Sequence, residues 1–292
     1  MGVSVSIGDI MRKAVYDTDY DDFIDGLSFI FGDNSDGDLE TTGNVDLSDV
    51  KFYDNLTIKA GHTITSSTKK FLFVFVKGTL IIETTGVISM NGKGAAGGAA
   101  SAQGTAGVYG GAGGAGGAKG LEPAGNGGNG VAPRASGGSG ATNATDGLIG
   151  LAGIDGSGYS VFNIVDFIEF VKNDTAFGSG GSGGTTGAGG GGAGGAGGAG
   201  GGIIIIFAQK VVNSGSIEAK GNAGAAGENN LTGGSGGGGG DGGLVIINTQ
   251  AYSGNSPLVT EGAGAAGGVG SSYGDGGAGA AGEEGKIHLN KG

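Results

Sequence analysis

Short apolar runs separated by polar and glycine-rich stretches recur along the chain. The runs are rich in isoleucine, valine and phenylalanine and are only a few residues long, which is typical of buried β-strands. Glycines between the early runs indicate turns at Gly61, Gly78 and Gly86. We therefore expect short stacked strands. The runs cover residues 56–58, 71–76, 80–82, 87–88, 203–207 and 244–247.

The second half of the chain repeats one unit. A glycine directly precedes an apolar strand that begins at Ile203, at Leu244 and at Lys286. The first strands of successive units therefore begin 41 and 42 residues apart. The second strands, at Ile217 and Val259, are 42 residues apart. Fixed periods of this size are typical of solenoids, in which each unit buries its apolar face against its neighbours.

Two segments have the spacing of an amphipathic helix instead. In residues 7–16 and 159–171, apolar side chains recur three and four positions apart. The second segment belongs to an excursion at residues 121–177 that interrupts the first glycine tract. We expect this helix to cover an open end of the glycine-rich body. In the alternative interpretation the irregular residues 121–152 form a recognition surface, because loops on a rigid scaffold commonly bind partners.

Composition narrows the class of protein. Glycine accounts for 77 of the 292 residues, whereas proline occurs three times and cysteine is absent. Three prolines cannot support a collagen helix, and a chain without cysteine is not a disulfide-stapled domain. A disordered glycine linker would not carry dense apolar runs, which aggregate when they are exposed.

Alanine recurs at every third position in the glycine tracts. The clearest series run from Ala112 to Ala118 and from Ala193 to Ala199, with glycine at both intervening positions. Three residues per turn is the period of the polyproline-II helix, whose N–H and C=O groups all point outward. The tracts therefore predict polyglycine-II helices bonded side by side, with alanine on the third face. Flexible linkers are the alternative, but a linker would tolerate any phase.

These patterns predict a mostly β and irregular fold with little α-helix. Short stacked strands, solenoid- or sandwich-like, would be combined with a polyglycine-II helix bundle. We expect an acidic attachment region at residues 1–40, a β-rich stem at 41–91 and a glycine-rich repeat region at 92–292. The head differs from the body in charge, since residues 1–60 hold 13 acidic and 4 basic residues of a chain with a formal charge of −12.

The acidic head contains a candidate calcium loop, and calcium is the one cofactor that the sequence indicates. Four aspartates supply oxygen ligands at relative positions 1, 3, 5 and 9, as at the start of an acidic calcium loop. Neighbouring aspartates repel one another unless a cation neutralises them. The sharp-turn glycine and the bidentate glutamate of such loops are missing, so a solvated acidic turn is the alternative. The four residues are Asp17, Asp19, Asp21 and Asp25.

Charge, hydropathy and residue types argue against several other functions. An acidic chain lacks the basic face that nucleic-acid binding requires. No apolar run approaches the ~20 residues of a membrane span, and residues 1–30 lack the order of a cleaved signal peptide. The two histidines, His62 and His288, lie in different β runs and no thiol is present, so no catalytic arrangement is recognisable. We expect a protein that is not an enzyme.

Tyrosines lie at interruptions of the glycine tracts. A tyrosine offers a large contact area at low entropic cost, which suits contact with a carbohydrate or an outer-membrane protein. Alternatively, these side chains only cap structural elements. The candidate receptor-binding residues are Tyr109, Tyr159, Tyr252 and Tyr273.

Four segments, residues 31–38, 52–64, 74–80 and 86–92, alternate strand-like runs with glycine-rich turns. Through these segments the chain, from about residue 31, resembles glycine-rich tail-fibre and receptor-binding proteins of tailed viruses of bacteria and archaea. Some phage tail-fibre adhesins pack polyglycine-II helices into a sandwich with recognition loops at one end, and the resemblance implies such an architecture here. The loop from Asp17 to Asp25 is similar to acidic loops near the start of such proteins. Specificity in those adhesins lies in variable loops, so no receptor residue is transferred.

The resemblance implies a non-enzymatic protein at the virion surface, outside the cell, that acts in host-receptor recognition and adhesion as a tail fibre or spike. Its N-terminal region would dock on other virion proteins, and its glycine-rich body would present a tip to a host glycan or outer-membrane protein. Two alternatives stay open: a purely structural fibre or decoration subunit, and a cellular surface adhesin. Fibre proteins are often trimers, whereas a glycine bundle can be complete in one chain, so the sequence leaves a homotrimer open.

Overall fold

The computed structural model describes residues 34–48, 50–100, 191–272 and 274–291. These residues form β-strands and irregular backbone and contain no helix, so the prediction of a mostly β fold is confirmed for them. The helices predicted at residues 7–16 and 159–171 lie outside the described residues. The strands are β1 (Gly37–Glu40), β2 (Val45–Asp46), β3 (Lys51–Ile58), β4 (Thr63–Thr65), β5 (Phe71–Ile82), β6 (Val87–Ser89), β7 (Ile203–Asn213), β8 (Ser216–Glu218), β9 (Leu244–Gly254) and β10 (Lys286–Lys291).

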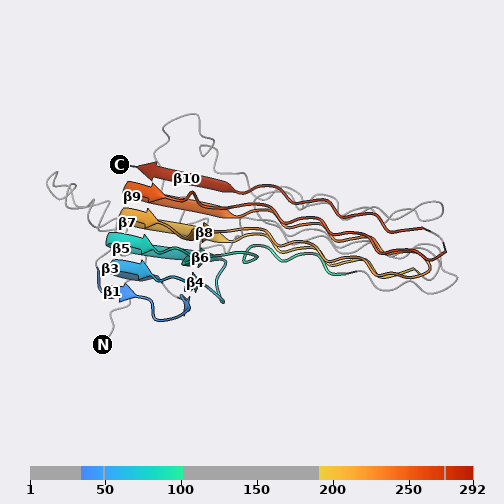
Figure 1. Cartoon of the computed structure of the whole chain (residues 1–292), viewed down its shortest axis with the longest axis horizontal. Coiled ribbons are helices and arrows are strands. Elements are labelled where there is room, and N and C mark those ends of the chain that lie inside the picture. The colour runs from blue at the N-terminus through green and yellow to red at the C-terminus, as the bar shows by residue number, and fades with distance from the viewer. Residues whose placement is uncertain (1–33, 49, 101–190, 273, 292) are drawn as a thin grey trace, which may run out of the picture.

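The strands form two parallel sheets. The large sheet has the order β1-β3-β5-β7-β9-β10 and the small sheet the order β2-β4-β6-β8. Up to β9 the chain therefore alternates between the sheets, a strand of the large sheet being followed by a strand or bridge at the small one. Figure 1 shows the large sheet as a row of arrows, from which long glycine-rich segments extend.

The strand register confirms the repeat spacing for the first strand of each unit and corrects it for the second strand of each unit. Ile203 pairs with Leu244, and Leu244 pairs with Lys286, as the 41- and 42-residue spacings predict. Opposite β8, however, Glu218 pairs with Leu258 in an isolated bridge. Ile217 and Val259, although they are 42 residues apart, are therefore not opposite each other in the small sheet. The reason is turn length, because the turn after β9 is one residue shorter than the turn after β7.

Gly78 does not separate two strands, contrary to the prediction. It lies inside β5, where the register with β7 shifts. A Cβ at this position would lie 2.4 Å from the side-chain Oδ1 of Asn55 and 3.0 Å from the carbonyl oxygen of Asp54, so a larger residue would crowd β3. Gly61 and Gly86 do mark turns, and Gly61 has the left-handed φ of +76° that favours glycine.

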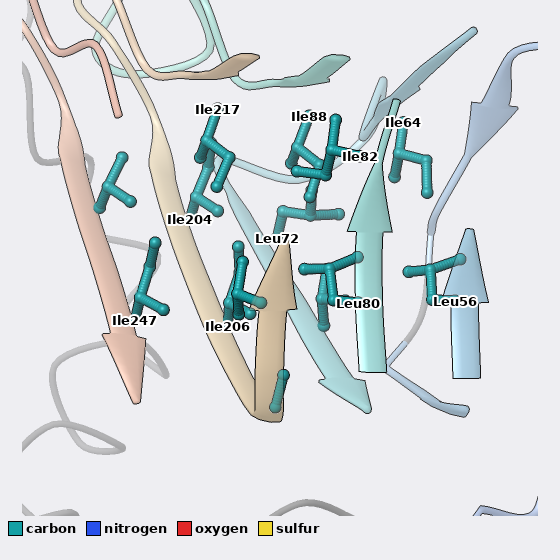
Figure 2. Packing of buried hydrophobic residues seen from close by; sticks show 14 of the residues in the cluster. Leu56, Ile64, Leu72, Leu80, Ile82, Ile88, Ile204, Ile206, Ile217 and Ile247 are labelled. Atoms are coloured by element: carbon teal, nitrogen blue, oxygen red, sulfur yellow. The ribbon is translucent and has the colours of Figure 1, made fainter. Parts of the chain in front are cut away.

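Alternate residues of the long strands fill the space between the two sheets. Ile204 and Ile206 of β7 are completely buried there, facing residues such as Ile217 of the small sheet (Figure 2). Each such side chain stabilises the fold by roughly 1.5–3 kcal/mol through its removal from water. The inner core thus holds the two sheets together.

The other face of the large sheet is buried as well. Ile203, Ile205 and Phe207 of β7 form a second cluster with side chains of β5 and β9. The ring of Phe75 stacks on that of Phe207, with centroids 5.0 Å apart. Strands buried on both faces lose the alternation of apolar and polar residues, which explains the continuous apolar runs in the sequence.

Between the strands the chain forms two kinds of glycine-rich tract. The outward tracts, residues 219–230 and 259–270, lead away from the small sheet. The inward tracts, residues 191–202, 232–243 and 274–285, lead into β7, β9 and β10. Figure 1 shows them as long segments that run side by side away from the strands.

Hydrogen bonds join neighbouring inward tracts at every third residue. The N–H groups of Gly192, Gly195, Gly198 and Gly201 donate to carbonyl groups of residues 232–241, at 2.8–2.9 Å. In the same way the middle tract donates to the last tract, at 2.8–3.1 Å. The donors of this second series are Gly233, Gly236, Gly239 and Gly242.

A third series joins the middle inward tract to the outward tract 219–230. Its acceptors are carbonyl groups of that outward tract, and its distances are 2.7–2.9 Å. Neighbouring residues of the middle tract therefore donate to different neighbouring tracts. The hydrogen bonds thus recur with the same three-residue period as the residues of the tracts. The donors of this third series are Gly234, Gly237, Gly240 and Gly243.

The close approach of these backbones dictates the glycines. A Cβ at Gly195 would lie 1.8 Å from the carbonyl oxygen of Ala225, and one at Gly237 would lie 2.0 Å from that of Ala196. Neither backbone could accept a side chain at that distance. Ala193, Ala196 and Ala199, by contrast, are partly exposed, so a methyl group fits on that face.

Candidate functional site

A candidate binding surface lies where the glycine-rich tracts turn back. We call residues 229–231 and 269–272 the distal turns; each connects an outward tract to the next inward tract. Figure 1 shows the tracts turning back at the end opposite the strands. The hydrogen-bonded tracts therefore hold the distal turns away from the two sheets.

Backbone and side-chain hydrogen bonds order the two distal turns against each other. Asn230 and Gly270 form a parallel bridge, and the N–H groups of Ser271 and Ser272 donate to carbonyl groups of the first turn at 2.9 and 3.0 Å. The side chain of Asn229 accepts a bond from the N–H of Val269 at 2.6 Å. The two turns thus form one joined surface.

This surface combines exposed apolar groups with hydrogen-bonding groups. Leu231 is 42% exposed and Val269 is 60% exposed, although both are large aliphatic residues. Asn229, Ser271 and Ser272 are exposed beside them. Apolar side chains therefore lie beside amide and hydroxyl groups on this surface.

The sequence prediction missed the distal turns. Their signal is the interruption of the glycine tracts by larger and polar residues, at 228–232 and again at 269–273. The prediction noticed the second interruption only through its tyrosine. That the two interruptions lie side by side follows from the packing of the tracts, which no local pattern reveals.

Among the predicted receptor-binding tyrosines, Tyr252 lies within the described residues, and its environment is structural. It belongs to β9 and packs against the inner core. Its hydroxyl group bonds the amide of Asn213 at 3.2 Å and donates to the carbonyl of Asn255. Burial raises the pKa of this phenol above its ordinary value. Its phenol group is therefore committed to neighbouring strands and turns.

The other predicted site residues lie outside the described residues. They include the candidate calcium loop and the excursion at residues 121–177, and the predictions for them stay predictions. The residues concerned are Asp17, Asp19, Asp21, Asp25, Tyr109, Tyr159 and Tyr273.

The histidines have separate surroundings. The Nδ1 atom of His62 and the hydroxyl oxygen of Thr41 are 2.8 Å apart. His288 belongs to β10, where burial and the nearby charge of Lys286 lower its pKa. In the part of the chain that the structure describes, no group of three or more histidine and carboxylate side chains could hold a metal ion.

A polar network ties the small sheet to the start of the glycine tracts. The carboxylate of Glu218 accepts bonds from Ser216 at 2.7 Å and from the amide of Asn91 at 2.8 Å, and Lys220 lies 3.1 Å away. Burial alone would raise the pKa of Glu218, but these donors outweigh it and lower the pKa. The charged form of Glu218 therefore stabilises this junction.

Within residues 34–100 and 191–291, apart from the two residues left undescribed there, no helix has the length and hydropathy of a membrane span. The comparisons with known proteins found no match, since no family model, no curated protein and no solved structure matches the chain. A function must therefore be inferred from the residues and their geometry.

Proposed function

We propose that the protein is a non-enzymatic virion surface protein, a tail fibre or spike that recognises a host receptor. The observation that supports this most is the array of hydrogen bonds between glycine tracts, which holds the distal turns away from the sheets. A stiff body that presents a small ordered tip suits adhesion at a distance. The sequence resemblance to glycine-rich tail-fibre proteins points the same way.

In this proposal the tracts are polyglycine-II helices packed as a bundle, and the two sheets are a short β-solenoid. A polyglycine-II helix has three residues per turn and directs its N–H and C=O groups outward to neighbouring helices. The three-residue period of the bonds from residues 192–201 and 233–243 supports this. The two parallel sheets, between which the chain alternates, support the solenoid.

The distal turns would carry the recognition surface. Leu231 and Val269 supply apolar contact area, and the neighbouring asparagine and serine side chains supply donors and acceptors for a glycan or a protein loop. The acidic N-terminal region would attach the molecule to other virion proteins, with calcium bound by the loop from Asp17 to Asp25.

Binding of the purified full-length chain to cell envelopes tests this function. Labelled protein is applied to a panel of bacterial and archaeal envelopes, and the double variant Leu231→Asp/Val269→Asp is compared with Leu258→Asp. Leu258 is 40% exposed and lies beside the small sheet, so it is a matched control. We expect the distal-turn variant to lose binding at least tenfold and the control to bind as the wild type does.

Other outcomes separate the alternatives. Absence of binding by the wild-type chain to every envelope would favour a purely structural subunit. Equal binding by both variants, with loss only when residues 121–152 are replaced, would move the recognition surface to the excursion. Binding by a protein that is never incorporated into particles would favour a cellular adhesin.

A further inference from the structure

The last inward tract, residues 274–285, lies at an edge of the glycine array. The middle tract, residues 232–243, bonds an inward tract on each side, whereas the last tract bonds one inward tract within the described residues. The corresponding strand, β10, likewise pairs only with β9 among the described strands. Comparing the two tracts therefore shows which residues occupy equivalent positions inside the array and at its edge.

The bonds to the outward tracts align the two inward tracts. Gly243 donates to the carbonyl of Ala219 at 2.7 Å, and Gly285 donates to that of Val259 at 2.8 Å. Moving back three residues at a time gives further equivalent pairs, such as Gly240 with Gly282. The positions just before these are then equivalent too. They are Gly233 with Asp275, Gly236 with Ala278, Gly239 with Ala281, and Gly242 with Glu284.

In the middle tract these four positions must be glycine. A Cβ at Gly236 would lie 2.1 Å from the carbonyl oxygen of Ala265, and one at Gly239 would lie 1.9 Å from that of Gly262. The same glycines donate N–H bonds to the last tract. The next outward and inward tracts can pack against these four positions only because none of them carries a side chain.

In the last tract all four equivalent positions carry a side chain and are exposed. The N–H groups of Ala278 and Ala281 make no hydrogen bond within the part of the chain described. The edge therefore has free donors of the kind that bind a neighbouring tract, but a Cβ stands beside each of them. Asp275 and Glu284 add negative charge at the two ends of this row.

We propose that Asp275, Ala278, Ala281 and Glu284 form an edge-protecting surface, which prevents the glycine tracts of a second copy of this chain from docking and extending the array. This rests on the lateral packing of tracts in the proposed function. A Cβ at each position keeps a second backbone from the distance at which the tracts bond. Like charges on the two copies oppose the same contact.

The exposed edge of β10 carries residues that act against pairing with another chain. Lys286 and Lys291 stand at the two ends of β10, and lysine at an exposed edge strand disfavours pairing with another chain. Antiparallel pairing of β10 with a second copy would bring these lysines opposite each other. Ile287 and Leu289 are exposed between the two lysines, so the lysines are the residues of β10 that act against pairing.

Replacement of the four edge residues by glycine tests the proposal. The variant Asp275→Gly/Ala278→Gly/Ala281→Gly/Glu284→Gly is compared with wild-type protein by sedimentation velocity over a range of concentrations. We expect larger species whose proportion rises with concentration. The matched control Ala278→Ser/Ala281→Ser changes two of the same residues but keeps a Cβ at each, and we expect it to sediment as the wild type does.

Two further variants separate size from charge and from misfolding. Asp275→Asn/Glu284→Gln keeps every Cβ and the side-chain oxygen of residue 275 that accepts a bond from the N–H of Gly270 at 2.8 Å, but removes the charge, and we expect wild-type sedimentation. Association as strong as that of the four-glycine variant would overturn the steric explanation. Ala278→Gly/Ala281→Gly is a milder change for which we expect weaker association.

The proposal is overturned if the glycine variants keep wild-type amide protection in residues 232–243 and still sediment as the wild type does, or if the serine control associates equally. A failure of the underlying tract packing would be distinguishable, because the amides of Gly234 and Gly237 would then exchange rapidly in the wild type.

Discussion

The strand stack and the glycine tracts are two halves of the same repeating unit with opposite kinds of core. In the strand stack, side chains such as Ile206 fill the space between two sheets. In the tracts, backbone lies directly on backbone, and Gly237 approaches the carbonyl of Ala196 so closely that no side chain could fit. The comparison teaches that one chain path supports either core, and that the residue pattern decides which one forms.

The two cores should respond oppositely to changes in side-chain size. In the strand stack, a smaller side chain leaves a cavity and removes buried apolar area. In the tracts, any added atom at a contact position separates two backbones and breaks their hydrogen bonds. The predictions below use this contrast.

The largest effect is expected from Gly195→Val. A Cβ at Gly195 would lie 1.8 Å from a backbone oxygen that cannot rotate away, and Gly195 donates a hydrogen bond to Ser235 at 2.9 Å. We expect the free energy of unfolding to fall by more than about 4 kcal/mol, or the tract to lose its order. Chemical denaturation and amide exchange measure the two outcomes.

Ala196→Ser is the control for that variant. Ala196 is partly exposed, so a hydroxyl group should fit and the free energy of unfolding should change by less than about 0.5 kcal/mol. Equal stability of the valine and serine variants would mean that the tract is a flexible connection.

In the strand stack, Ile206→Ala is expected to cost about 2–5 kcal/mol, the range for a large-to-small change in a packed core. Ile206 is completely buried between the two sheets. Thermal or chemical denaturation provides the measurement. A loss below about 1 kcal/mol would contradict a close-packed inner core at this residue.

The sequence predicted those features of both regions that depend on local pattern. The pairing of Ile203 with Leu244 and of Leu244 with Lys286 followed from glycine placed before each apolar strand. The three-residue phase of the hydrogen bonds followed from the regular alanines. Both features follow from short sequence patterns that recur along the chain.

The features that the sequence did not predict depend on distant contacts. Gly78 lies close to Asn55 and to the backbone of Asp54 on another strand, and it marks no turn. The bonds of the Tyr252 hydroxyl group to Asn213 and Asn255 involve a strand 39 residues earlier as well as a local turn. The meeting of the two distal turns depends on which tracts lie side by side.

Tyr252→Phe should have a smaller effect than either core variant. It removes a hydroxyl group that bonds Asn213 and Asn255 while keeping the ring in place. We expect a loss of about 1 kcal/mol in the free energy of unfolding and no change in envelope binding. Loss of binding without loss of stability would support the prediction that Tyr252 contacts the receptor.

Glu218→Gln should alter how stability depends on pH. Because the folded protein lowers the pKa of Glu218 below its usual value of 4.5, this carboxylate contributes stability above that pH, and the contribution is lost as the pH falls through the lower folded value. Denaturation at several pH values below 5 measures the slope. We expect a shallower loss in acid for the glutamine variant than for the wild type. Identical slopes would contradict the role of Glu218 at this junction.

The most direct test of the laterally bonded glycine tracts is native-state amide exchange along residues 221–243. The hydrogen bonds predict protection that follows the three-residue period, with Gly221, Asn222, Gly224 and Ala225 protected while Ala223 and Ala226 exchange rapidly. Gly234, Gly237 and Gly240 should be protected as strongly as the strand residue Ile247. Uniformly fast exchange across these glycines, with the strands still protected, would contradict an ordered backbone core.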